Sequence, residues 1–148
     1  MIYRTFWPRV AAAFIDSFLL WPLLIIQTSQ ADDSLGFISI MILVLQHSYY
    51  IIGHAQYGQT LGKRLLGVKV VRAHQHLPVT WKHAFMRESL WIAVSIIYSL
   101  PYFEKATLWM AIPGFILIAG DAMTAFIHPQ HRSIRDFIAK TVVIRLQL

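Results

Sequence analysis

The sequence predicts an all-α membrane protein: a four-span transmembrane helical bundle with a small cytoplasmic β element and an interfacial helix. Three observations favour this class, namely the composition, four long apolar runs and the one-sided placement of the basic residues. Of the 148 residues, 57% are hydrophobic and only 14% are charged, and the mean hydropathy is +0.54. Soluble domains contain roughly 45–50% apolar and about 25% charged residues, so a water-soluble monomer is excluded. The length fits one domain over residues 1–148.

The apolar runs are candidate membrane spans. A helix needs about 20 apolar residues to cross the hydrocarbon core of a bilayer. The runs that meet or approach this length are residues 10–28, 35–53, 86–103 and 106–127. The third is the shortest, because only 15 uncharged residues separate Glu88 from Glu104. We expect its helix to continue upstream through Trp81 at the level of the lipid headgroups.

The basic residues predict how these spans are oriented. Cytoplasmic segments next to membrane spans are enriched in Lys and Arg. Four crossings place twelve of the thirteen basic residues on one side and leave Lys105 on the other, the side of Asp32 and Asp33. Both termini, the insert 54–85 and the tail 128–148 are therefore expected to be cytoplasmic. This placement assigns the net charge of +6 to a membrane face rather than to nucleic acid.

The cytoplasmic segments contain two short β-branched runs and one amphipathic stretch. The β-branched runs are residues 66–73 and 141–146, and pairing them would satisfy the open edge that each leaves alone. A small cytoplasmic sheet is therefore predicted. Four glycines between residues 53 and 67 predict a loop before the first run. The apolar residues around Asp136, within 134–138, predict a short helix at the membrane interface.

Two carboxylates, Asp16 and Asp121, fall inside candidate spans. A charge in the bilayer costs at least about 2.5–3.5 kcal/mol, so such groups are candidates for a functional site. Arg9 lies two helical turns before Asp16 and shares its helix face, and Arg132 and Arg135 are further cations that could neutralise the two acids. Two carboxylates that share one cation have separated pKa values and can exchange protons or bind Na⁺. A structural salt bridge that holds the bundle together is an equally weighted alternative.

A glycine-rich segment follows the second span. A phosphate-binding P-loop has four residues between its glycines and a Ser or Thr after its Lys. This segment has three intervening residues, and Arg64 follows Lys63, so nucleotide binding is rejected. We predict a tight turn whose Lys63 and Arg64 contact anionic lipid headgroups, each contributing about 1 kcal/mol. The residues assigned to this turn are Gly58, Gln59, Thr60, Gly62, Lys63 and Arg64.

Enzyme chemistry has little support in the sequence. Cysteine is absent, and no serine lies in a nucleophile-elbow context. Four histidines lie on the predicted cytoplasmic side with no diagnostic metal-ligand spacing: His74, His76, His128 and His131. We therefore expect a protein that is not an enzyme and that has neither a metal site nor a cofactor.

Three segments together resemble the RDD family of small bacterial integral membrane proteins. These are RVAAAFID at 9–16, GQTLGKRLLGVKVV at 58–71 and RSIRDFIAKTVV at 132–143, and together they extend over nearly the whole chain. Two positions depart from the family pattern. Leu61 stands where the family often has proline, and Lys140 replaces a common glycine before the Thr-Val-Val run.

The family is named after one arginine and two aspartates, which correspond by position to Arg9, Asp16 and Asp136. The resemblance implies a multi-span bundle in the bacterial inner (cytoplasmic) membrane and a transport role, with cation/proton antiport suggested for some members. An Arg9 shared between Asp16 and Asp136 would tie the first helix to the tail.

Two functions are carried forward from the sequence. The first is a secondary transporter that exchanges protons for Na⁺ or another small cation, with Asp16 and Asp121 alternating between protonated and ion-bound forms. The alternative is a non-catalytic membrane scaffold or assembly factor in which Arg9, Asp16 and Asp136 are structural locks. Because four short helices enclose little aqueous space, a homo-oligomer is expected.

Overall fold

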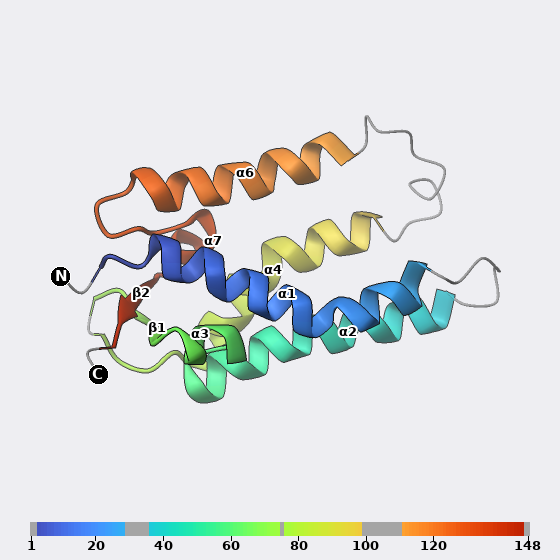
Figure 1. Ribbon diagram of the computed structural model, residues 1–148, viewed down its shortest axis with the longest axis horizontal. Helices are drawn as coiled ribbons and strands as arrows, with labels where there is room; N and C mark the ends of the chain where they lie inside the picture. The colour runs from blue at the N-terminus through green and yellow to red at the C-terminus, as the bar shows by residue number, and fades with distance from the viewer. Residues whose placement is uncertain (1–2, 29–35, 75, 99–110, 147–148) are drawn as a thin grey trace.

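Four long helices run along the long axis of the part of the chain that the structure describes (Figure 1). The computed structural model describes residues 3–28, 36–74, 76–98 and 111–146. The long helices are α1 (Phe6–Thr28), α2 (Gly36–Ile52), α4 (Trp81–Tyr98) and α6 (Ala111–Ile127). The start of α4 at Trp81 confirms the expected upstream extension of the third apolar run.

The short elements gather at one end of the molecule, where both ends of the chain also lie (Figure 1). They are η2 (Gly53–Tyr57), α3 (Leu61–Leu65), β1 (Val68–Arg72), α7 (Ile134–Ile138) and β2 (Thr141–Arg145). A hydrogen bond from Thr5 Oγ1 to the carbonyl oxygen of Val143, at 3.5 Å, joins the segment before α1 to β2. The two ends of the chain are thus held on the same side of the helical bundle.

The predicted β element is confirmed. Strands β1 and β2 pair antiparallel, with Val68 opposite Arg145 and Arg72 opposite Thr141. Val68 and Val70 of β1 and Val143 of β2 form a small buried apolar core with Val79 and with Ala84 of α4. This core forms because β-branched side chains pack well on a pleated surface. The sheet therefore attaches the tail to the insert.

The long helices expose their apolar residues and bury their polar ones. Phe14 and Phe18 on α1 and Phe115 on α6 are each more than 70% exposed. In contrast, Asp16 on α1, Glu88 on α4 and Asp121 on α6 are each at most 5% exposed. A soluble monomer rarely shows large contiguous apolar surface, whereas a bilayer covers such surface.

One helical stretch, Phe37–Tyr57, is long and apolar enough by itself to cross a membrane, among the residues described. Ile112–Ile127 is a shorter apolar helix. The predicted turns that contain Asp32, Asp33 and Lys105 lie outside the described residues.

The loop predicted for residues 53–67 is wrong in part, because the chain there is mostly helical. Helix α2 continues into one π-helical segment, η2, which is followed by Gly58 with a left-handed φ of 68°. A side chain at Gly58 would meet the carbonyl oxygen of Val70 at 2.9 Å, so the glycine allows the turn to lie against β1. The short helix α3 then begins at Leu61.

Candidate functional site

Asp136 joins four separate parts of the chain. Its carboxylate is fully buried and forms ion pairs with Arg9 of α1, at 2.8 Å, and with Arg87 of α4. Thr141 Oγ1, at the start of β2, donates to the same carboxylate at 3.3 Å. The prediction that Asp136 pairs with Arg9 is therefore confirmed, and Arg87 is a second partner that the sequence did not indicate.

Asp136 also caps its own short helix. The backbone N–H of Ser133 donates to Asp136 Oδ2 at 3.0 Å, and together the two residues form a capping box at the start of α7. Burial alone raises the pKa of Asp136, but the guanidiniums of Arg87 and Arg9 outweigh it and hold the pKa well below its ordinary range. The carboxylate is therefore ionised at neutral pH and acts as a fixed structural charge.

Asp16 is held by a different set of groups. It accepts hydrogen bonds from Tyr49 at 2.7 Å, from the hydroxyl of Thr60 at 2.5 Å and from the backbone N–H of Gly62 at 2.8 Å. No ion pair joins it to Arg9 within the described residues, so the expected sharing of Arg9 between Asp16 and Asp136 is wrong. The reason is that α3 folds back onto α1 and offers the carboxylate uncharged donors.

Gly62 makes this contact possible. A Cβ atom on Gly62 would overlap the backbone carbonyl oxygen of Ala12, so α3 can approach α1 only at a glycine. Thr60 and Gly62 of the glycine-rich segment therefore donate hydrogen bonds to the carboxylate of Asp16 on α1. Gln59 of the same segment donates from Nε2 to the carbonyl oxygen of Val68 at 3.0 Å, and this hydrogen bond holds the turn against β1.

Asp121 has a partner of its own. Arg135 contacts it through Nε at 3.0 Å, through Nη2 at 2.8 Å and through its backbone N–H at 3.1 Å. Burial by itself lowers the pKa of Arg135, but Asp121 reverses this and raises it above its ordinary value. Because Asp16 and Asp121 have separate partners, the expectation that they share one cation is wrong.

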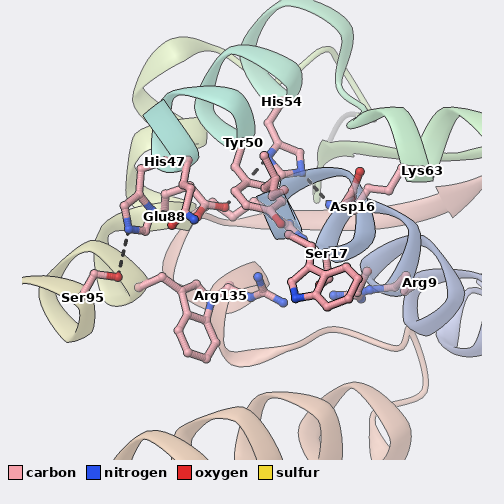
Figure 2. A pocket seen from close by; sticks show the side chains of 16 residues that line it. Arg9, Asp16, Ser17, His47, Tyr50, His54, Lys63, Glu88, Ser95 and Arg135 are labelled. Carbon is pink, nitrogen blue, oxygen red and sulfur yellow. Dashed lines mark hydrogen bonds and ion pairs between the residues drawn. The ribbon is translucent and has the colours of Figure 1, made fainter. Parts of the chain in front are cut away.

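A polar cavity of ≈ 370 Å³ lies between α1, α2 and α4, next to these locked residues. Its walls include Arg9, Asp16, Lys63 and Arg135, together with residues of α2 and α4 that the sequence pattern does not indicate. Figure 2 shows these side chains converging on one space, with Arg9 and Arg135 on one side of it.

A cluster of titratable side chains lines the side of the cavity formed by α2 and α4. Glu88 is 2% exposed, and its carboxylate lies 3.8 Å from His47 Nδ1 and 4.0 Å from His54 Nδ1. His54 Nε2 contacts Lys63 Nζ at 2.7 Å, and His47 Nε2 contacts the hydroxyl of Ser95 at 3.0 Å (Figure 2). We call these five residues the Glu88 cluster.

The Glu88 cluster leaves several buried polar atoms without a hydrogen-bond partner among the described residues. They are Glu88 Oε1, His47 Nδ1 and His54 Nδ1. Buried polar atoms are normally satisfied, so such atoms facing a cavity indicate a place for protons, water or a small ion. Within the same described ranges, no group of three or more His, Asp or Glu side chains has the geometry of a metal site.

Lys63 points inward, which differs from the prediction that it contacts lipid headgroups. Burial, followed by the charges of Arg87, Arg135 and Arg9, lowers the pKa of Lys63 well below its ordinary value. Its ammonium is therefore able to lose a proton at a pH much lower than a surface lysine would. Arg64, next in the chain, remains exposed.

Counted with every carboxylate as an anion and every histidine as neutral, the formal charges around the cavity sum to zero only when Lys63 carries its proton. The buried carboxylates in this region are Asp16, Glu88, Asp121 and Asp136, and the guanidiniums are Arg9, Arg87 and Arg135. With the histidines neutral, four negative charges face three fixed positive ones. Loss of the Lys63 proton leaves one negative charge that another proton or a monovalent cation can neutralise.

The sequence contained a signal for part of the Glu88 cluster. Ionisable side chains within a membrane span are functional candidates by default, and His47 lies inside the second apolar run. A neutral histidine adds no formal charge to that run, so a count of formal charges does not reveal it. Glu88 directly precedes the 15 uncharged residues of the third run, so it resembles a charge at the end of a span.

These features define a helical membrane protein whose polar residues are enclosed by outward-facing apolar helices. The chain belongs to the RDD family, since the model described as "RDD family" matches residues 3–140. It is also similar to a Bacillus subtilis (strain 168) protein named "Uncharacterized membrane protein YteJ". The two are 25% identical over 157 residues, which cover 99% of this chain and 83% of the relative. No solved structure matches the chain.

Proposed function

We propose that this protein is a secondary transporter that exchanges protons for Na⁺ or another small monovalent cation, with the Glu88 cluster as its exchange site. The observation that carries the proposal is a buried carboxylate, 2% exposed, with an unpartnered oxygen at a polar cavity within a membrane protein. A carboxylate in such a place binds a proton or a cation, because an uncompensated charge there is costly.

The Glu88 cluster also has the order of a proton pathway. It begins with Lys63 in the predicted cytoplasmic insert, continues through His54, Glu88 and His47, and ends at Ser95. The seven residues from Glu88 to Ser95 correspond to about 10 Å along α4. The gaps of about 4 Å on either side of Glu88 are distances at which a small rotation or one water molecule completes the connection.

The proposed topology has four crossings and cytoplasmic termini, in a bacterial inner membrane. Support comes from the four long helices that run side by side along one axis and from the two ends of the chain at the same end of the bundle (Figure 1). The excess of Lys and Arg in the segments assigned to that side agrees with this orientation.

In this proposal the RDD family residues keep the site in place. Arg9, Asp16 and Asp136 are each engaged in buried contacts and none has the open coordination that an exchanging ion needs. This arrangement also favours the second candidate function, a membrane scaffold without transport activity, in which the same contacts are structural locks.

Transport in liposomes tests the proposal. The purified protein is reconstituted with a pH-sensitive dye inside, and Na⁺, Li⁺ or K⁺ is added outside. Cation-driven proton movement is expected with the wild-type chain and is expected to be abolished by Glu88→Gln. Because Gln keeps the shape of Glu88, the variant should elute from size-exclusion chromatography at the wild-type position.

A histidine pair provides a matched control. His54→Gln is expected to slow the proton movement, whereas His74→Gln, at an exposed position outside the cavity, should leave it unchanged. Absence of flux from correctly folded wild-type protein would reject the transporter and leave the scaffold. Unchanged flux in Glu88→Gln would reject the assignment of the site.

A further inference from the structure

A second hollow, lined by different faces of the insert and by mostly apolar residues of α1 and α2, differs in chemistry from the polar cavity. It has a volume of ≈ 600 Å³ and is lined by α1, α2, η2 and α3, and we call it the α1–α3 groove. Its apolar wall is formed by Leu20, Leu23 and Leu45, and its other end by Tyr57 and Arg64. The volume is in the range of about 300–1,000 Å³ that small-molecule sites occupy.

The two ends of the α1–α3 groove match the two parts of a phospholipid. Leu45 lies two turns before Ile52 on α2, which places it about 10 Å deeper in the proposed bilayer. Tyr57 and Arg64 lie beyond the end of α2, at the level where aromatic and basic side chains meet lipid headgroups. The groove is thus apolar at its deeper end and polar at the end of α2, as a lipid is apolar along its acyl chains and polar at its headgroup.

Arg64 is available to bind an anion. Its side chain is exposed, and no hydrogen bond or ion pair of its guanidinium is made with the residues that the structure describes. The neighbouring polar groups are already engaged, since Gln59 donates to Val68 and Tyr49 donates to Asp16. A guanidinium binds a phosphate through two parallel hydrogen bonds, which makes it the one group here suited to that role.

We infer that the α1–α3 groove binds one anionic phospholipid, with an acyl chain along Leu23 and Leu45 and the headgroup phosphate at Arg64. The lipid would cover apolar surface of α1 and α2 and would hold α3 against them. Because α3 supplies the Gly62 N–H that Asp16 accepts, the lipid lies next to one of the family's structural contacts. This inference does not depend on transport, since the groove and the Glu88 cluster share no residue.

Photo-crosslinking tests the inference. The full chain is reconstituted into phosphatidylcholine vesicles that contain a small amount of phosphatidylglycerol with a photoreactive acyl chain. A parallel sample contains phosphatidylcholine with the same acyl chain. After illumination, labelled peptides are identified by mass spectrometry. Labelling of the peptides that contain Leu23 and Leu45 is expected to be about fivefold stronger with the anionic lipid, as expected for one Arg at an anionic headgroup.

Two pairs of variants make the result specific. Arg64→Gln should abolish the preference for the anionic lipid, whereas Arg145→Gln, which removes an exposed cation on β2, should retain it. Leu45→Trp should block labelling of the groove, whereas Ile40→Trp, on the same helix but outside the groove, should not. Both tryptophan variants are checked for a wild-type elution volume.

Three outcomes would overturn the inference. Equal labelling by the two lipids in the wild type would mean that the groove meets only bulk lipid. A preference for the anionic lipid that survives Arg64→Gln would remove the headgroup assignment. Absence of labelling at Leu23 and Leu45 by either lipid in the wild type would show that the groove is not open to lipid.

Discussion

Arg9, in the first helix, and Asp136, close to the end of the chain, form a buried ion pair with Nη2 and Oδ2 2.8 Å apart. Arg87 binds the other oxygen of the same carboxylate. One carboxylate therefore forms ion pairs with two guanidiniums, from α1 and α4, while it also caps α7. Replacing Asp136 leaves two buried guanidiniums without a carboxylate, whereas replacing either arginine leaves the carboxylate with one guanidinium.

Replacement of Asp136 is expected to be the most damaging change at this contact. Asp136→Asn leaves two buried guanidiniums without their carboxylate and should lower the free energy of unfolding by about 3–5 kcal/mol. Arg9→Gln should cost less, because Asp136 keeps Arg87. Denaturant unfolding in detergent micelles measures both. Arg145→Gln, at an exposed position, is the control and should change stability by less than about 0.5 kcal/mol.

The charge-swapped double variant of Arg9 and Asp136 distinguishes a simple pair from this three-residue contact. An isolated ion pair would be restored by exchanging its charges. Here the exchange would place a new arginine beside Arg87, so the double variant should remain as unstable as Asp136→Asn. Recovery of wild-type stability would show that Arg87 does not contribute.

The same carboxylate predicts how stability depends on pH. The pKa of Asp136 is lower in the folded protein than its ordinary value of 3.8, so the unfolded chain binds the proton more tightly. The contribution is therefore complete above about pH 4 and is lost as the pH falls below that value. Thermal unfolding in detergent between neutral and acidic pH should show this loss in the wild type and a smaller one in Asp136→Asn.

The close approach of α3 to α1 gives a fourth prediction. Gly62→Ala places a methyl group against the carbonyl oxygen of Ala12 and should lower the free energy of unfolding by about 1–3 kcal/mol. Gly120→Ala on α6 is the control, because its added methyl group would lie 3.6 Å from Ile134, an ordinary contact. That control should be neutral or stabilising by up to about 1 kcal/mol. Equal losses in both variants would contradict the steric explanation.

Local sequence pattern was sufficient to predict the small sheet. The β-branched runs that form β1 and β2 favour strands, and each run is the partner of the other. The amphipathic spacing around Asp136 predicted α7 for a similar reason, and Trp81 marked the start of α4. These elements depend on short-range preferences that one sequence contains.

The partners of the buried charges were not predictable in the same way. Arg9 and Asp16 share a helix face, but which carboxylate the guanidinium meets depends on how α7 and α3 fold back onto α1. Helix periodicity contains no information about such contacts. The Glu88 cluster joins α2, α3 and α4, so its members are distant in sequence and become recognisable as a site only when the helices are packed.

Lys140 shows how the structure explains a departure from the family pattern. It has a left-handed φ of 52° and follows Ala139, the C-cap of α7, at the position where helices commonly have glycine. A left-handed residue with a side chain costs roughly 1–2 kcal/mol, whereas glycine there loses about 0.5–1 kcal/mol of extra conformational entropy on folding. Lys140→Gly should therefore raise the free energy of unfolding by up to about 1 kcal/mol. Lys140→Ala removes the same charge and keeps the strain, so it should bring no gain, and an equal gain in both variants would assign the effect to charge.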